Sequence, residues 1–283
     1  MPKSVQLPKR KSEMTLNEAI NILKAAGVEN PEFDARELFF RFGNFSRHEL
    51  VSRSISLDDD VIATPVSERA ARKPLQYIIG RADFYRESYK VCPDCLIPRQ
   101  DTEILVDYAV KSIPDGESFI DLCTGSGCIA ISTLKNTKST SCLAVDISDS
   151  ALAVAKENAD ENGVRDRIEF LKSDALSFTP PRKIFALLSN PPYVTEEEYE
   201  KLDEELYHEP RMALVARDNG LEFYKKITAL AKNAIKPHGF IAFEIGKDQA
   251  DALRKIAEEN LMTAEIINDF SHHPRVAILR NTK

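Results

Sequence analysis

The stretch SFIDLCTGSGCIA, residues 118–130, joins a short apolar run to a turn with two glycines and then to a second apolar segment. A short apolar run bounded by turn residues is typical of a buried strand. Glycine lets the backbone adopt positive φ and approach a ligand closely. A helix that begins after the turn offers free N–H groups to an anionic group. We therefore predict a strand, a ligand-binding turn and a helix over these residues.

A second strand is predicted over residues 142–146, and it ends in the carboxylate of Asp146. Asp146 lies about 20 positions beyond Gly125, the spacing at which an acidic residue accepts hydrogen bonds from ribose hydroxyls. The dinucleotide fingerprint G-x-G-x-x-G is absent, because residue 123 is Cys and residue 130 is Ala. Asp121, before the turn, would repel a phosphate but could pair with an ammonium group. S-adenosylmethionine, which has a ribose and an amino-acid group but no phosphate, therefore fits better than a nicotinamide dinucleotide.

The tetrapeptide Asn190-Pro191-Pro192-Tyr193 follows a third apolar run, residues 185–189. Two prolines cannot continue a sheet ladder, so the strand should end there and present the Asn and Tyr side chains at its carboxyl end. Ligands of open α/β sheets bind at that edge. Asn supplies an acceptor and a donor, and Tyr supplies a flat apolar face. A plain proline-rich turn would explain the tetrapeptide alone, but the ordered set of glycine turn, acid and tetrapeptide favours a clamp for a carboxamide or an exocyclic amine.

The first 80 residues are expected to form a small helical domain. Thr15 and Glu18 make a capping box, and apolar residues then follow helical spacing. A second helix should begin at Asn30-Pro31, and a third long helix should span residues 57–71. We expect three phenylalanines of the second helix to lie in the core of this domain, namely Phe39, Phe40 and Phe42.

The rest of the chain is expected to form a linker and a larger domain. Alternating aromatic residues predict a β-hairpin linker over residues 81–98. Strands and helices alternate over residues 99–283, which predicts an α/β fold with a doubly wound, mostly parallel sheet. The Cys92–Cys95 CxxC pair has no second pair beside it, so we expect a hairpin turn rather than a metal site. His272 and His273 are expected to be solvated loop residues.

Composition limits the classes further. With 43% hydrophobic and 29% charged residues, the chain of 283 residues has the balance of a globular protein. No apolar run reaches the roughly 18 residues of a membrane span. The basic start, residues 1–14, lacks the apolar region of a secretory signal. Five scattered cysteines suggest a reducing compartment. We therefore expect a cytoplasmic protein. The net charge of −7 disfavours a direct nucleic-acid partner, and the short basic stretch Lys9-Arg10-Lys11 is interpreted as a tail.

Several motifs together resemble the HemK/PrmC family of N5-glutamine methyltransferases. These are D-L-C-T-G-S-G at 121–127, A-V-D-I-S at 144–148 and S-N-P-P-Y-V at 189–194. The resemblance continues in residues 74–80, 96–103, 209–211 and 244–246. It covers about residues 70–280 closely and the first 70 only in general character.

The resemblance implies a seven-stranded methyltransferase sheet that binds S-adenosylmethionine. The implied cofactor-binding residues are Asp121, Cys123, Thr124, Gly125, Ser126, Gly127, Asp146, Asp174, Ala175 and Asn190. Asn190, Pro191 and Tyr193 would be catalytic, and with Pro192 they would hold the substrate amide. The implied substrate is the glutamine of the Gly-Gly-Gln motif in class I peptide chain release factors, with the helical domain recognising that protein. The oligomeric state is left open.

Two other activities remain as alternatives at this point. The same tetrapeptide could accept the N6 amine of adenine in a nucleic acid, and a nicotinamide-dependent oxidoreductase could use the first half of the pattern. The sequence also departs from the family pattern at Cys123, Gln100, Ala175 and the pair Ala216-Arg217. None of these departures removes a group that the chemistry needs.

Overall fold

The computed structural model describes residues 12–52, 54–138 and 140–282. Contacts divide the chain into two compact units, Met1–Ile79 and Gly80–Lys283. The basic stretch at residues 9–11 lies outside the described residues. No helix in the described parts of the chain is long and apolar enough to cross a membrane.

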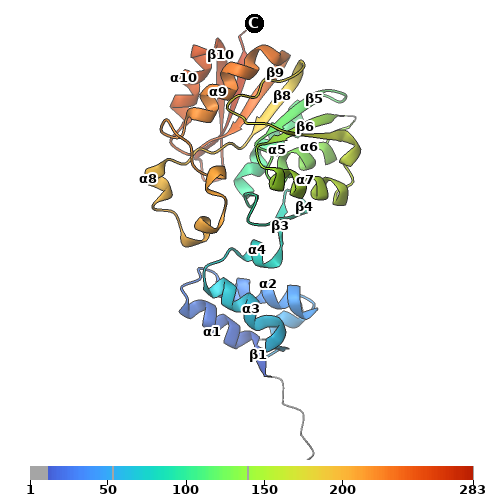
Figure 1. Cartoon of the computed structure of the whole chain (residues 1–283), viewed down its shortest axis with the longest axis vertical. Helices are drawn as coiled ribbons and strands as arrows, with labels where there is room; N and C mark the ends of the chain where they lie inside the picture. Colours follow the sequence, from blue (N-terminus) through green and yellow to red (C-terminus); the bar gives the residue numbers. More distant parts are fainter. Residues whose placement is uncertain (1–11, 53, 139, 283) are drawn as a thin grey trace, which may run out of the picture. The chain divides into compact units, whose positions relative to one another are not determined.

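The helices of the first unit in its described residues pack around one core, and Figure 1 shows them side by side. They are α1 (Leu16–Ala25), α2 (Pro31–Gly43), α3 (Asp59–Ala70) and α4 (Leu75–Ile79), with η1 (Glu49–Val51) between them. The capping box is confirmed, because the Thr15 hydroxyl accepts from the Glu18 backbone N–H and the Glu18 carboxylate accepts from the Thr15 N–H. A buried ion pair between Arg69 and Asp34, at 2.6 Å, ties α3 to α2.

Two details of this unit differ from the prediction. The third helix begins at Asp59 rather than Leu57, because Leu57 lies in β2 (Ser56–Asp58), which pairs with β1 (Glu13–Thr15). Phe40 is 38% exposed, whereas Phe39 is buried and Phe42 packs partly against the core. Successive residues of a helix point in different directions, so the core face that takes Phe39 cannot take Phe40 as well.

The second unit contains the predicted seven-stranded sheet, with strand order β10-β11-β9-β8-β5-β6-β7. The parallel strands are β5 (Ser118–Leu122), β6 (Ser141–Asp146), β7 (Ile168–Lys172), β8 (Ile184–Ser189) and β9 (Ile235–Glu244). The hairpin strands β10 (Met262–Asn268) and β11 (Pro274–Asn281) add an antiparallel edge. The strand order reverses between β5 and β8, and such a switch point is where open α/β sheets bind ligands.

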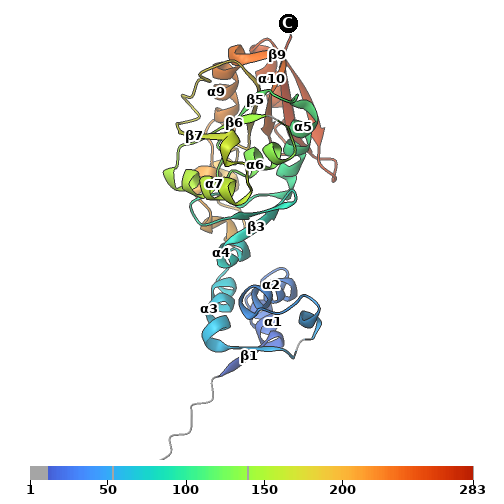
Figure 2. The ribbon, with the colours of Figure 1, turned by 90° about the vertical axis from the view of Figure 1, so that its right-hand side faces the viewer.

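Helices cover both faces of this sheet, as Figures 1 and 2 show. One core lies under α5 (Glu103–Ser112), α6 (Cys128–Lys135) and α7 (Asp149–Glu161). The other lies under α9 (Glu222–Ala231) and α10 (Ala250–Glu259). Neighbouring strand residues such as Phe119 and Ile120 enter opposite cores, so the strands are apolar without alternation. Shorter segments lie between these elements, namely η2 (Gln100–Thr102), η3 (Arg165–Arg167), α8 (Glu196–Tyr199), η4 (Glu204–His208), η5 (Arg211–Ala213) and η6 (Lys232–Ala234).

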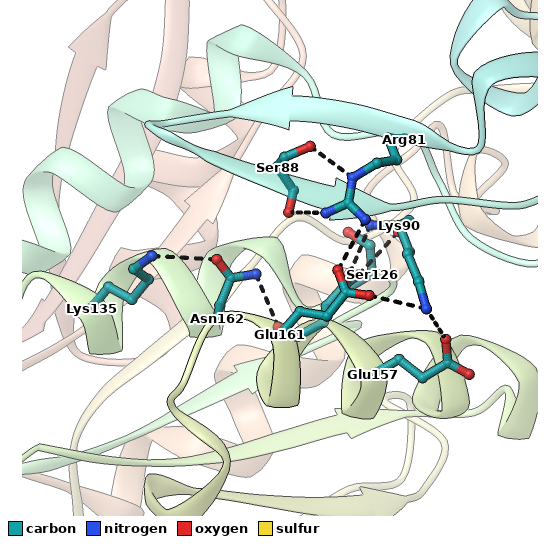
Figure 3. A network of polar contacts seen from close by, with 9 residues as sticks. Arg81, Ser88, Lys90, Ser126, Lys135, Glu157, Glu161 and Asn162 are labelled. Atoms are coloured by element: carbon teal, nitrogen blue, oxygen red, sulfur yellow. Dashed lines mark hydrogen bonds and ion pairs between the residues drawn. The ribbon is translucent and has the colours of Figure 1, made fainter. Parts of the chain in front are cut away.

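The predicted hairpin consists of β3 (Arg81–Phe84) and β4 (Glu87–Lys90), and it belongs to the second unit. Figure 3 shows its cations pointing to α7: Arg81 pairs with Glu161 at 3.0 Å, and Lys90 pairs with Glu157 at 2.9 Å. The turn at Cys92–Cys95 is present, but it follows the hairpin instead of closing it, because β4 has already ended.

Candidate active site

The three sequence motifs meet at a cavity of about 480 Å³ at the carboxyl ends of the parallel strands. This volume lies within the range of roughly 300–1,000 Å³ usual for small-molecule sites. The predicted residues that line it are Cys123, Thr124, Gly125, Ser126, Asp146, Asp174, Ala175, Asn190 and Pro192. Asp121, Gly127, Pro191 and Tyr193 are not part of its lining.

The glycine turn joins β5 to α6 through several left-handed residues. Cys123, Gly125 and Gly127 have φ angles of 64°, 54° and 82°. A Cβ on Gly127 would lie 3.1 Å from both the Ala155 Cβ and the Ile131 side chain, so this position needs a glycine for close packing. Cys123 adopts a left-handed conformation that a side chain disfavours and that glycine adopts readily.

Asp146 ties the end of β6 to the glycine turn. One carboxylate oxygen accepts from the Gly125 N–H at 2.9 Å, and the other accepts from the Ser148 N–H at 2.9 Å. An ionised carboxylate offers about four acceptor positions, so two remain for the hydroxyls of a ligand. In the cavity lining, Asp146 therefore keeps acceptor positions for a ligand, and it lies next to the glycine turn, whose backbone can approach that ligand closely.

Asp121 supports the same turn from beneath it. Its Oδ2 accepts from the Thr124 hydroxyl at 2.6 Å and from the Ala130 N–H at 3.1 Å, while Oδ1 has no partner among the described residues. Burial, with a smaller contribution from Asp146, raises the pKa of the Asp121 carboxyl to about 7. Asp121 is completely buried and lies behind the cavity lining, so its pairing with a ligand ammonium stays a prediction.

The Asn-Pro-Pro-Tyr tetrapeptide begins where β8 ends at Ser189, as the two prolines predict. The Asn190 Nδ2 lies 3.4 Å from the Thr102 hydroxyl, and the Tyr193 hydroxyl donates to the Glu244 carboxylate at 3.3 Å. The Tyr193 carbonyl accepts from the Gln249 side chain at 3.2 Å. Burial and the nearby Glu244 charge raise the pKa of Tyr193 above its usual value, so its hydroxyl stays protonated.

Several residues around the tetrapeptide were not singled out individually from the sequence. Thr102 and Arg99 both line the cavity, and the Thr102 hydroxyl donates to the carboxylate of the buried Glu244. Glu209 accepts from the Ile97 N–H at 2.9 Å and pairs with Arg99. The sequence signals for Glu244 are its place in the family-like stretch 244–246 and an acidic residue at the end of an otherwise apolar strand, I-A-F-E.

The donor set fits S-adenosylmethionine. Asp146 has free acceptor positions for ribose hydroxyls, Asp174 lies in the same lining, and Ile147, Leu176 and Phe223 supply apolar walls. No group of three or more His, Cys, Asp or Glu residues in the described part of the chain is arranged to hold a metal ion.

Comparison with known proteins agrees with this geometry. A model of the "Methyltransferase small domain" matches residues 100–220, and a model of the "PrmC N-terminal domain" matches residues 15–80. A ribosomal protein L11 methylase from Lactobacillus delbrueckii subsp. bulgaricus is 19% identical, with a TM-score of 0.50 over 68% of this chain and 84% of that one, which supports the fold. The fold, the cavity and these matches define an S-adenosylmethionine-dependent methyltransferase.

Curated relatives give the family. The release factor glutamine methyltransferase of Moorella thermoacetica is 36% identical over 86% of this chain and 88% of its own length. The protein of the same name from Caulobacter vibrioides is 33% identical over 90% of this chain and 91% of its own length. The chain therefore belongs to the family of release factor glutamine methyltransferases.

Proposed function

We propose that this enzyme methylates the side-chain nitrogen, N5, of the glutamine in the Gly-Gly-Gln motif of class I peptide chain release factors. The names of the relatives support a release factor as substrate. The observation that carries the proposal is the Asn190 carboxamide in the cavity lining, whose NH₂ group is directed to Thr102. Its oxygen is then available to an incoming amide N–H.

The chemistry requires precise positioning, because the lone pair of an amide nitrogen is delocalised into its carbonyl. S-adenosylmethionine, when bound, supplies an activated methyl group on a sulfonium. We assign the Asn190 Oδ1 as the acceptor for one N–H of the substrate amide and the Pro191 carbonyl as the acceptor for the other. Two fixed acceptors would orient the nitrogen, and exclusion of water from the cavity would strengthen both bonds.

Tyr193 would supply the flat surface for the substrate amide. Its ring packs against the core under α9 and α10, and its hydroxyl is held by Glu244 at 3.3 Å. A ring held at both its face and its hydroxyl has little freedom to rotate, so it can limit the tilt of an amide that lies against it.

We also propose that the N-terminal unit recognises the protein substrate. The match of residues 15–80 to the PrmC N-terminal domain supports a role that belongs to this family rather than to methyltransferases in general. The side chains of this unit that lie in solvent include Phe33, Val51 and Ile22, which are apolar groups suited to contact another protein.

Adenine N6 is the second candidate acceptor, since it also carries two N–H donors on a planar group. Charge argues against it. Glu196 lines the cavity but is paired with Arg211, and Arg99 and Arg217 also line it. Beyond that pair, Glu197 and Glu198 in the first turn of α8 and the net charge of −7 would repel the phosphates of a nucleic acid.

A single labelling experiment tests the proposal. The enzyme is incubated with methyl-labelled S-adenosylmethionine and, in separate tubes, a class I release factor, the same factor with its Gly-Gly-Gln glutamine replaced by glutamate, and duplex DNA. We expect label on the glutamine of the unaltered factor alone. Label on the altered factor would refute the assigned acceptor, and label on DNA alone would establish the alternative.

A further inference from the structure

We propose that Glu244 and Thr102 are positioning residues that fix the orientation of the Asn190 carboxamide. In that orientation its oxygen, and not its NH₂ group, faces the substrate amide nitrogen that receives the methyl group. The inference rests on the proposed function, in which Asn190 accepts a hydrogen bond from the substrate amide. It adds the cause of that orientation, which lies outside the tetrapeptide.

The three residues come from distant segments and meet at the edge of the cavity. Thr102 ends η2, Asn190 follows β8, and Glu244 ends β9. The Thr102 hydroxyl donates to the Glu244 Oε2, and the Asn190 Nδ2 lies 3.4 Å from the Thr102 oxygen. Thr102 and Glu244 are 2% and 1% exposed, so water has little access to compete for these bonds.

The orientation follows from counting protons. A hydroxyl carries one proton, and an ionised carboxylate can only accept. Thr102 and Tyr193 both donate to Glu244, and two donors favour the ionised carboxylate. With Glu244 ionised, the proton of Thr102 goes to it, and the Thr102 oxygen is left as an acceptor. The part of the Asn190 carboxamide next to it must then be the NH₂ group, which directs the Oδ1 away from Thr102.

The opposite orientation of the Asn190 carboxamide would prevent it from binding the substrate amide. If the Thr102 proton were free, it could be donated to the Asn190 Oδ1, and the carboxamide would rotate to present its NH₂ group. That group would then meet the N–H of the substrate amide, donor against donor. An unpaired buried donor is unfavourable, so the orientation of one side chain decides whether the amide is held or repelled.

Glu244 holds the other end of the tetrapeptide as well. Its Oε1 accepts from the Tyr193 hydroxyl at 3.3 Å, and its backbone carbonyl accepts from the Tyr224 hydroxyl at 3.0 Å. Burial raises the pKa of the Glu244 carboxyl above its ordinary value, and the Thr102 hydrogen bond, the Arg275 charge and the Tyr193 hydrogen bond limit that rise. Arg275 is itself fixed between Asp101 at 3.1 Å and Asp269 at 3.2 Å. The Glu244 carboxylate therefore orients Asn190 indirectly, through Thr102, and it holds Tyr193 by a direct hydrogen bond.

The test compares three threonine variants. Thr102→Val removes the hydroxyl at nearly constant volume, and Thr102→Ser restores it. Thr228→Val is the matched control, because Thr228 is also completely buried and its hydroxyl has no partner among the described residues. We expect kcat on the release factor to fall by about 10- to 100-fold in Thr102→Val, which is the range for a lost buried hydrogen bond in the transition state. Thr102→Ser should recover most of that loss, and Thr228→Val should behave as wild type.

Two further measurements separate positioning from a general structural defect. Calorimetric affinity for S-adenosylmethionine should stay within about threefold in all three variants, a change of less than 1 kcal/mol. The side-chain NH₂ resonances of Asn190, assigned by their loss in Asn190→Asp, should shift in Thr102→Val and stay near their wild-type positions in Thr102→Ser. Unchanged resonances in Thr102→Val would refute the proposed orientation, whatever the activity.

Failure of the inference can be distinguished from failure of the proposed function. Wild-type enzyme that leaves the glutamine unlabelled would refute the function, while the resonances still report on Asn190. Wild-type kcat in Thr102→Val, with glutamine methylation intact, would refute the positioning role alone.

Discussion

Replacement of Asp146 by alanine tests the assignment of the ribose acid. The carboxylate accepts from the Gly125 and Ser148 N–H groups, each at 2.9 Å, and has acceptor positions left for ligand hydroxyls. Hydrogen bonds to a charged group contribute about 1.5–3 kcal/mol. We therefore expect the Kd for S-adenosylmethionine to rise by about 10- to 150-fold in Asp146→Ala.

Asparagine at this position should not rescue binding. Both carboxylate oxygens of Asp146 face backbone N–H groups, so one end of an asparagine side chain would place its NH₂ against the N–H of Gly125 or Ser148. Two donors that face each other cannot bond, and the turn would have to move. Asp146→Asn is therefore expected to lose affinity nearly as strongly as Asp146→Ala, although its volume is unchanged.

Asp149 provides the matched control. It lies in the first turn of α7, its side chain is 73% exposed, and it pairs with Lys172 on the surface. Calorimetric titration with S-adenosylmethionine and thermal unfolding should be measured on all the variants. Wild-type affinity in Asp146→Ala would refute the reasoning, and so would an equal loss in Asp149→Ala. A lower melting temperature with unchanged affinity would leave Asp146 with a role in the turn only.

Three further predictions follow from the site and the two units. Asn190→Ala should lower kcat in single-turnover methylation by roughly 10- to 200-fold with little change in cofactor affinity. Asn190→Asp keeps an acceptor oxygen and should retain more activity. Wild-type turnover of the Ala variant would mean that the Asn190–Tyr193 tetrapeptide is only a turn. A chain shortened to residues 80–283 should bind S-adenosylmethionine but methylate intact release factor poorly, and an equal kcat/KM in the two forms would contradict substrate recognition by the first unit. Burial raises the pKa of Asp121 from 3.8 to about 7, so its stabilising contribution is present below the lower value and is lost as pH rises through the higher one. Chemical unfolding should therefore show Asp121→Asn gaining stability relative to wild type across that interval, and a constant difference would exclude the shift.

The sequence predicted those parts of the fold that depend on local signals. The strand over Ser118–Leu122 has the expected bounds, and β6 and β8 begin one residue earlier than expected and end where predicted, at Asp146 and Ser189. Their ends are marked by a carboxylate or by prolines, which are readable without knowledge of the fold. The strands β1 and β2 of the first unit were missed, since each is only 3 residues long and is defined by its pairing.

Contacts between distant segments were beyond the reach of sequence patterns. Thr102 and Glu244 are separated by 142 residues, and their bond exists only because η2 and β9 meet beside the tetrapeptide. Each residue has an ordinary local context, a helix start for Thr102 and a strand end for Glu244. Their significance depends on both partners being buried, which only the folded structure determines.

The need for this buried support follows from the nature of the acceptor. An amide nitrogen is so weakly nucleophilic that its position relative to the methyl donor must be controlled closely, and two hydrogen bonds control it only if their acceptors are fixed. The Pro191 carbonyl is restrained by the proline ring, whereas the Asn190 carboxamide can rotate about its side chain. A residue that can rotate needs neighbours that distinguish its oxygen from its nitrogen, and an apolar wall cannot do so. A hydroxyl whose single proton is already donated to a carboxylate can distinguish the oxygen from the nitrogen, because it can only accept. The Thr102 hydroxyl beside Glu244 is such a group.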